Sequence, residues 1–113
     1  MQYALLIYRL PDDLDGLSEQ EQTEALQEYW KLRSEPGFID GAGLQLPETA
    51  TTLRMENGKP VVTDGPFADT KEFFAGYYVF EAPDLDAATE LAARIPAVRL
   101  GGTIEIRPLM EKP

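Results

Sequence analysis

Apolar runs alternate with polar, turn-rich segments along this chain. Tyr3 to Tyr8 and Phe73 to Phe80 are continuous apolar runs of strand length, which is typical of strands buried on both faces. Thr51 to Met55 and Thr103 to Leu109 alternate apolar and polar positions, as half-buried strands do. These four segments are predicted to be strands.

Two further strands are indicated by glycine and turn signals. Phe38 to Gln45 contains Gly41 and Gly43, which predicts a short, bent strand with a bulge or a close backbone approach. Asn57-Gly58 is a strong two-residue hairpin signal, and it predicts that Pro60 to Thr63 pairs with the strand before it.

A capping box predicts the start of a first helix. In Ser18-Glu19-Gln20-Glu21, the Ser18 hydroxyl can accept a hydrogen bond from the third helical N–H, and Glu21 can reach back to the cap. The helix is expected to run to about Ser34, because Pro36-Gly37 ends it. Its buried stripe is expected to comprise Ala25, Tyr29 and Leu32, with Leu26 and Trp30 beside them.

A second helix is expected after Pro83, capped by Asp84 or Asp86 and ended by Pro96. Its apolar stripe comprises Ala88, Leu91, Ala92 and Ile95. The order of elements is then strand, helix, strands, strand, helix, strand, which makes two βαβ-like halves. This order predicts a single domain, residues 1–113, with an α+β, ferredoxin-like sheet that carries both helices on one side.

This topology leaves one face of the sheet uncovered. Both faces of the two long apolar strands are apolar, whereas two helices cover only one face. A bare aromatic sheet would exceed the apolar patch that soluble monomers tolerate. We therefore expect a homodimer whose sheets pack face to face; the alternative is that loop residues 9–17 and 44–50 fold over the open face.

The loop from Thr63 to Glu72 concentrates turn signals and charge. Asp64-Gly65 and Gly65-Pro66 both mark loops, since Gly65 can adopt positive φ and Pro66 fixes its own φ at about −65°. Such a loop can hold the Asp64 side chain in one direction, as a functional carboxylate requires.

The same loop carries a resemblance to a known family. Residues 62–96, which contain the tetrapeptide Asp64-Gly65-Pro66-Phe67, resemble the YCII-related proteins that bear a DGPF motif. Residues 1–10, 41–67 and 103–110 fit the same pattern, so the resemblance covers nearly the whole chain. It implies a ferredoxin-like fold assembled as a dimeric α/β barrel, and it implies little about a reaction.

Composition excludes several classes of partner and of chemistry. The chain has 20 acidic and 10 basic residues, no cysteine and no histidine. An acidic chain without a basic cluster argues against nucleic acid and anionic membranes as partners. The missing residue types exclude thiolate chemistry and remove the commonest general base and most transition-metal sites, so no cofactor and no metal are expected. With no signal peptide and no apolar run of membrane-spanning length, a cytoplasmic protein is expected.

Asp64 is the first candidate for chemistry. Between the apolar walls of a cleft, its carboxyl could accept or donate a proton as a general acid or base. The alternative is an Asx-type turn, in which the Asp64 side chain accepts backbone N–H groups around Gly65 and Pro66. Both roles are compatible if one oxygen fixes the loop and the other faces the cleft.

Charged and aromatic neighbours complete the candidate site. Asp69, Lys71 and Glu72 form either a polar rim for a ligand or a solvated turn. Arg54 and Arg107 either bind a ligand carboxylate or pair with Glu56 or Glu105 on the sheet. The aromatic residues near the loop either line a pocket or belong to the core or dimer interface: Phe67, Phe73, Phe74, Tyr77 and Tyr78. The ligand contacts expected at this site are Gly65, Pro66, Phe67, Lys71, Glu72, Tyr77, Arg54 and Arg107.

One departure from the resembled pattern bears on mechanism. Related chains tend to carry histidine before the last strand, where this chain has Arg99-Leu100-Gly101, and some relatives are thought to use a His–Asp pair. This chain therefore lacks such a pair. Three functions stay open: a small-molecule-binding or accessory protein, a cofactor-independent isomerase or lyase that uses Asp64, and a regulatory module of the kind associated with sigma-factor signalling.

Overall fold

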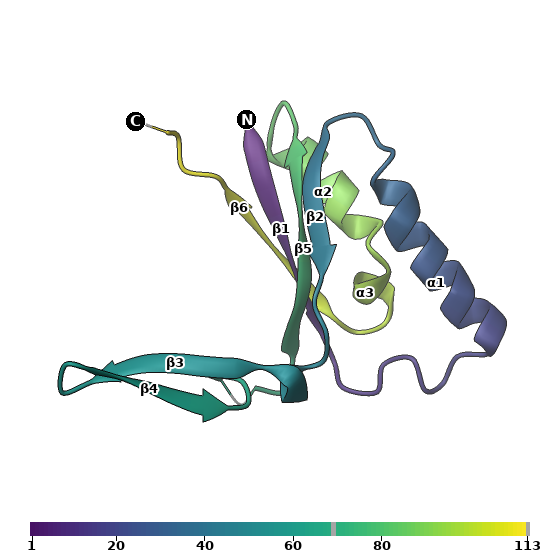
Figure 1. The fold of residues 1–113 in the computed structure, drawn as a ribbon. Coiled ribbons are helices and arrows are strands. Elements are labelled where there is room, and N and C mark those ends of the chain that lie inside the picture. The colour runs from purple at the N-terminus through teal and green to yellow at the C-terminus, as the bar shows by residue number, and fades with distance from the viewer. Residues whose placement is uncertain (69, 113) are drawn as a thin grey trace.

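The computed structural model describes residues 1–68 and 70–112, and it has a sheet, a helical layer and a projecting arm (Figure 1). The sheet is antiparallel, with strand order β2-β5-β1-β6. Its strands are β1 (Gln2–Arg9), β2 (Phe38–Gly43), β5 (Phe73–Glu81) and β6 (Thr103–Pro108). The α+β class is confirmed, and the strand order is consistent with a ferredoxin-like fold.

The helices cover one face of the sheet (Figure 1). They are α1 (Glu19–Leu32), α2 (Leu85–Ala93) and the short α3 (Pro96–Arg99), and a single 3-10 turn, η1 (Pro47–Thr49), follows β2. The capping box is confirmed, since Ser18 Oγ accepts from Glu21 N at 3.1 Å and Ser18 N donates to Glu21 Oε1 at 3.1 Å. Asp84 caps α2.

Pro96 starts a helical turn where the sequence predicts only an end. Pro96 is the first residue of α3, because a fixed φ and a missing N–H suit that position. The core between the layers contains the fully buried side chains of Leu5, Phe80 and Ile95. Leu26 and Trp30 of α1 do not join this core: they are 59% and 61% exposed.

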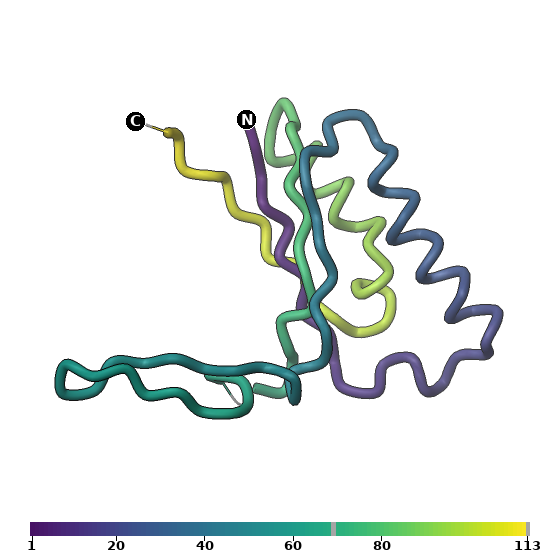
Figure 2. Tube along the Cα trace, in the orientation of Figure 1, coloured from purple at the N-terminus to yellow at the C-terminus, as the bar shows by residue number. Residues whose placement is uncertain are grey.

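The other face of the sheet has no helix over it (Figure 1). Ala4, Leu6 and Tyr8 of β1 point to this face, and their cross-strand partners on β5 are Val79, Tyr77 and Phe74. The rings of Tyr8 and Phe74 lie 5.5 Å apart between centroids. Loop 10–17 runs from β1 to α1 on the helical side, so it does not cover this face (Figure 2). The open apolar face predicted from the sequence is thus present.

A two-stranded arm stands away from both layers (Figure 2). It consists of β3 (Thr51–Glu56) and β4 (Lys59–Asp64), which pair only with each other, and Asn57 and Gly58 form its tip with φ of 50° and 78°. The radius of gyration is 16.1 Å, against about 13 Å for a compact chain of this length. In the described part of the chain, no helix is long and apolar enough to cross a membrane.

Candidate functional site

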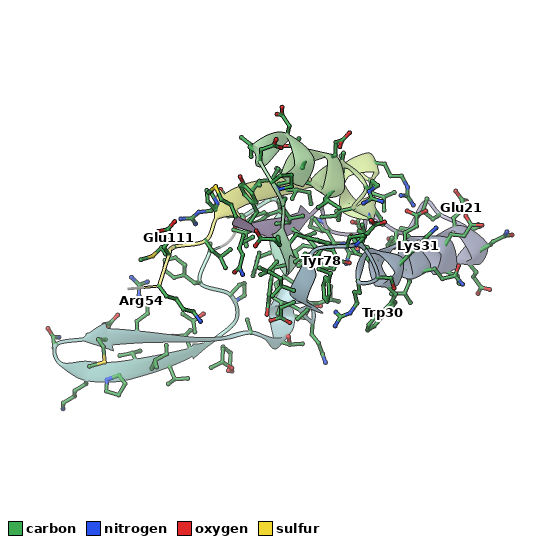
Figure 3. The ribbon with its side chains drawn as sticks, turned by 90° about the horizontal axis from the view of Figure 1, so that it is seen from above. Glu21, Trp30, Lys31, Arg54, Tyr78 and Glu111 are labelled. Carbon is green, nitrogen blue, oxygen red and sulfur yellow. The ribbon has the colours of Figure 1, made fainter. Side chains whose placement is uncertain are left out.

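A cavity of about 270 Å³ lies between α1 and the sheet. Six residues of α1 and its C-terminal end form one wall: Gln22, Ala25, Leu26, Tyr29, Trp30 and Arg33. The sheet supplies the opposite wall, which includes Tyr78, and Leu14, Leu44 and Leu100 come from the connecting segments. Figure 3 labels Trp30 and Tyr78 at the junction of the two layers.

Two facing glycines keep this cavity open. Gly43 of β2 is the cross-strand partner of Gly76 of β5, and both lie on the helical face of the sheet. Gly43 is exposed at the edge of the cavity, and a Cβ added there would meet nothing within 4 Å. A Cβ added at Gly76 would lie 2.5 Å from the Ala42 carbonyl oxygen. The missing side chains therefore create the space at Gly43 and allow the close strand approach at Gly76.

Arg9, which lines the cavity, forms an ion pair with Asp13. Arg9 donates to both carboxylate oxygens of Asp13, at 2.9 Å and 2.7 Å, and its guanidinium lies 5.5 Å from the centre of the Phe73 ring. The hydrogen bond to Asp13 raises the pKa of Arg9. The Asp13 side chain is only 3% exposed, so this bidentate pair is shielded from water and holds the start of loop 10–17 against β1.

Two tyrosines of the cavity lining carry hydroxyl groups that other parts of the protein hold. Tyr78 Oη donates to the backbone carbonyl of Tyr29 at 2.5 Å, which ties the sheet to α1. Burial raises the pKa of Tyr78 to about 12. Burial also raises the pKa of Tyr29, and the positive charge of Arg9 partly opposes that effect. Both groups are therefore protonated at neutral pH.

Arg33 is the second cation of the cavity lining. Its guanidinium carbon lies 5.0 Å from the centre of the Trp30 ring and 5.1 Å from that of Phe38. Its Nη1 donates to the Gly41 carbonyl at 3.0 Å. Within residues 1–68 and 70–112, no carboxylate lies within 4 Å of Arg33. The stacking rings fix the direction of this guanidinium, and its charge has no counter-ion there.

The predicted site residues lie mostly elsewhere. Tyr77 is among the residues that line the cavity. Asp64 is exposed at the end of β4, outside the lining of this cavity. Arg54 lies on the arm, well apart from Trp30 and Tyr78 (Figure 3). The Tyr77 side chain points to the open sheet face with Leu6, so Tyr77 borders the cavity only from the edge of that wall. Tyr78, the other tyrosine of the predicted aromatic group, faces the helical layer and lines the cavity, whereas Asp64 lies with the arm.

The loop after the arm has the predicted backbone but few enclosing contacts. Gly65 has φ +100°, its N–H donates to the Ala50 carbonyl at 2.8 Å, and its carbonyl accepts from Thr52 Oγ1 at 2.7 Å. Phe67 is 73% exposed, and the Arg54 guanidinium lies 5.3 Å from its ring centre. Pro66 is exposed beside it.

The remaining predicted residues are distributed over the surface. Lys71 and Glu72 line a separate hollow with Tyr8 and Leu10, and Glu72 accepts from Thr103 Oγ1 at 3.1 Å. Arg107 lies 3.9 Å from Glu105 and is exposed, which is the surface pairing given above as its alternative. Asp69 lies outside the described residues. The roles assigned to all these residues stay predictions.

Most of the lining residues are not among the predicted site residues, and Arg9, Arg33 and Gly43 matter most among them. The two glycines of β2 were recognised as a sign of close backbone approach, and this was the available signal. Leu100 also lines the cavity, and it is the position at which the resemblance implies a histidine. That position therefore faces the cavity in this chain, with an apolar side chain in place of a base.

Comparisons with known proteins agree with the fold. The model of the YCII-related domain matches residues 1–112, and the chain belongs to this family. An uncharacterized protein of Rhizobium meliloti (strain 1021), R00369, is 32% identical over 114 residues, which cover 96% of this chain and 92% of that protein.

A solved structure with a similar fold is 5-chloro-2-hydroxyhydroquinone dehydrochlorinase (TftG) from Burkholderia phenoliruptrix AC1100, in complex with 2,5-dihydroxybenzoquinone. The TM-score is 0.54 at 14% sequence identity, and the match covers 99% of this chain and 96% of that one. At this identity the likeness concerns the fold alone.

Proposed function

We propose that this protein binds one small, ring-containing molecule in the cavity between α1 and the sheet. The observation that carries the proposal is the space above Gly43, which leucine, tryptophan and tyrosine side chains surround. Concave, largely apolar sites with a few placed polar groups are where proteins bind small molecules. The pair of exposed apolar side chains, Leu26 and Trp30, gives such a molecule an apolar entrance.

Binding without turnover is the favoured form of this proposal. The chain has no histidine, and Leu100 lines the cavity at the position where the resemblance implies one. The tyrosines of the cavity lining are neutral, and their raised pKa values make them poor bases near neutral pH.

The test uses a variant that fills the cavity. In Gly43→Leu the new side chain enters space that holds no atom within 4 Å of its Cβ. Small ring compounds, with 2,5-dihydroxybenzoquinone among them as the ligand of the structural neighbour, are screened for stabilisation of the wild-type protein against heat. Compounds that stabilise the wild type are expected to lose their effect on Gly43→Leu.

Gly16→Leu is the matched control. Gly16 also has free space around its added Cβ, and it is not among the lining residues, although Leu14 of the same loop is. This variant is expected to respond to the same compounds as the wild type. If compounds stabilise Gly43→Leu as strongly as the wild type, they bind elsewhere and the proposal is wrong.

We also propose that two chains assemble through the open sheet face. The apolar row on β1 and β5 has no helix over it, and one face of the arm adds Leu53, Met55 and Val62, each 65% exposed. A second copy supplies a surface of the same apolar character, as an isologous interface requires. Light scattering at micromolar concentration is expected to give twice the chain mass.

A charge on the open face provides the matched pair of variants. Leu6→Glu puts a carboxylate at the centre of this face and is expected to yield a monomer. Leu85→Glu puts the same charge on α2, on the helical side, and is expected to leave the mass unchanged. A wild-type protein that is monomeric under these conditions contradicts the assembly.

Catalysis by Asp64 remains a second, separate prediction. Asp64 is the last residue of β4 and pairs with Thr51, the first residue of β3, so it lies at the base of the arm. An isomerase or lyase that used Asp64 as its base would need walls from a second copy to exclude water.

A further inference from the structure

We infer that the cavity takes a single-ring organic anion of the carboxylate class, with its charge held by Arg33. This inference rests on the proposed binding function and adds the chemical class of the ligand. Three features of the described residues support it: the sign of charge at the cavity, the fixed position of one guanidinium, and the size and character of the walls.

The charge at the cavity is opposite to that of the whole chain. The protein carries a formal net charge of −10. Among the cavity-lining residues of the described chain, however, there are two arginines and no aspartate or glutamate. Arg9 is neutralised by Asp13, so the unbalanced positive charge belongs to Arg33. A cation beside an apolar space attracts an anion more strongly than one in open water does.

The Arg33 guanidinium is also held in place before a ligand arrives. Trp30 and Phe38 stack against it, and the Gly41 carbonyl accepts one of its N–H groups. An arginine has five N–H donors, so this arrangement leaves donors for the two oxygens of a carboxylate. Little side-chain freedom is lost when the anion binds, because the rings already restrict the guanidinium.

The walls select for one ring. An apolar cavity of roughly 150 Å³ holds a benzene molecule, so the 270 Å³ present here has room for a substituted ring. Leucine and aromatic side chains line the space for the ring, and Gln22 adds one neutral polar side chain to this lining. The walls contain no carboxylate to hold a cationic ligand, so an amine is excluded by charge.

Three ligands of nearly the same shape separate charge from shape. Benzoate is anionic, benzamide is neutral and benzamidine is cationic, and calorimetric titration measures the affinity of each. Benzoate is expected to bind the wild type at least tenfold more tightly than benzamide, because hydrogen bonds to charged groups are the stronger ones. Benzamidine is expected to bind most weakly.

Variants of Arg33 then test the residue. Arg33→Gln is expected to weaken the affinity for benzoate about tenfold or more and to leave the affinity for benzamide nearly unchanged. Arg33→Lys keeps the charge without the planar fork, and its affinity for benzoate is expected to lie between those of the wild type and Arg33→Gln. Arg94→Gln removes the same charge from a surface pair with Glu35, outside the cavity lining, and is expected to bind benzoate like the wild type.

The results that overturn the inference differ from those that overturn the proposed function. If benzoate and benzamide bind with equal affinity, or if both affinities fall equally in Arg33→Gln, the site selects its ligand by shape and not by charge. The binding function survives these results. If neither these ligands nor any other ring compound binds in a way that Gly43→Leu removes, the binding function itself is wrong. Arg33→Lys gives the same comparison if Arg33→Gln does not fold.

Discussion

Alanine is expected to have opposite effects at the two glycines that face each other on the cavity floor. Gly43 and Gly76 are cross-strand partners in the same sheet and on the same face. Their surroundings differ: an added Cβ has free space at Gly43, whereas at Gly76 it would lie 2.5 Å from the Ala42 carbonyl oxygen. A Cβ atom essentially never lies closer than 3.0 Å to a heavy atom of a residue that is not its chain neighbour, so β2 must move when Gly76 is replaced.

The magnitudes follow from these two environments. Gly76→Ala forces an overpacked contact against backbone, which costs about 1 to 3 kcal/mol. Gly43 does not have positive φ. Gly43→Ala therefore restricts mainly the unfolded chain and is expected to stabilise by about 0.4 to 1 kcal/mol. For a domain of this size, 1 kcal/mol corresponds to roughly 4 °C in Tm.

Thermal and urea denaturation of the two variants measure this difference. Gly76→Ala is expected to melt roughly 4 to 12 °C below the wild type, and Gly43→Ala roughly 2 to 4 °C above it. Since both replacements add the same methyl group to the same sheet, each is the control for the other. Equal melting temperatures, or a loss at Gly43 as large as that at Gly76, would refute the account of the cavity floor.

Three further predictions concern the loop, the pH dependence and the chemistry. Gly65→Val is expected to destabilise by about 1 to 3 kcal/mol, because Gly65 holds φ +100° in open space and strain is then the main effect; an unchanged melting temperature would contradict this. Burial raises the pKa of Tyr78 to about 12 in the folded chain, from an ordinary value of 10.0. The unfolded chain therefore loses the proton first, and the free energy of unfolding falls as pH rises from 10 to 12. Tyr78→Phe is expected to remove that part of the alkaline loss, and an unaltered alkaline profile would argue against the buried hydroxyl. Asp64→Asn is expected to abolish any turnover without changing ligand affinity in the cavity; a loss of cavity affinity would show that Asp64 reaches the bound ligand.

Local signals predicted the elements of the fold because the forces behind them act over a few residues. The Ser18 and Glu21 capping box and the Asn57-Gly58 turn each depend on neighbours in the chain, and both are present. Pro96 was assigned as an end only, since the sequence does not show that a second helical turn follows.

The cavity could not be predicted in the same way. It depends on the register that places Gly43 against Gly76 and on the packing of α1 over that pair. Trp30 fits a helical stripe by spacing, yet it is 61% exposed, and the Arg33 guanidinium lies 5.0 Å from its ring centre. The Arg33 guanidinium is oriented by its contact with the Phe38 ring, which lies across the turn after α1. Such tertiary contacts leave no periodic mark in the sequence.

The arm has a consequence for how the chain unfolds locally. A single two-stranded hairpin is at best marginally stable in water, and β3 and β4 pair only with each other. In an isolated chain, the arm amides are therefore expected to exchange with solvent deuterium through local opening, while β1 and β5 exchange only on global unfolding. If a second copy covers the arm, protection of its amides becomes dependent on protein concentration, and ordering of the arm becomes part of the energy of association.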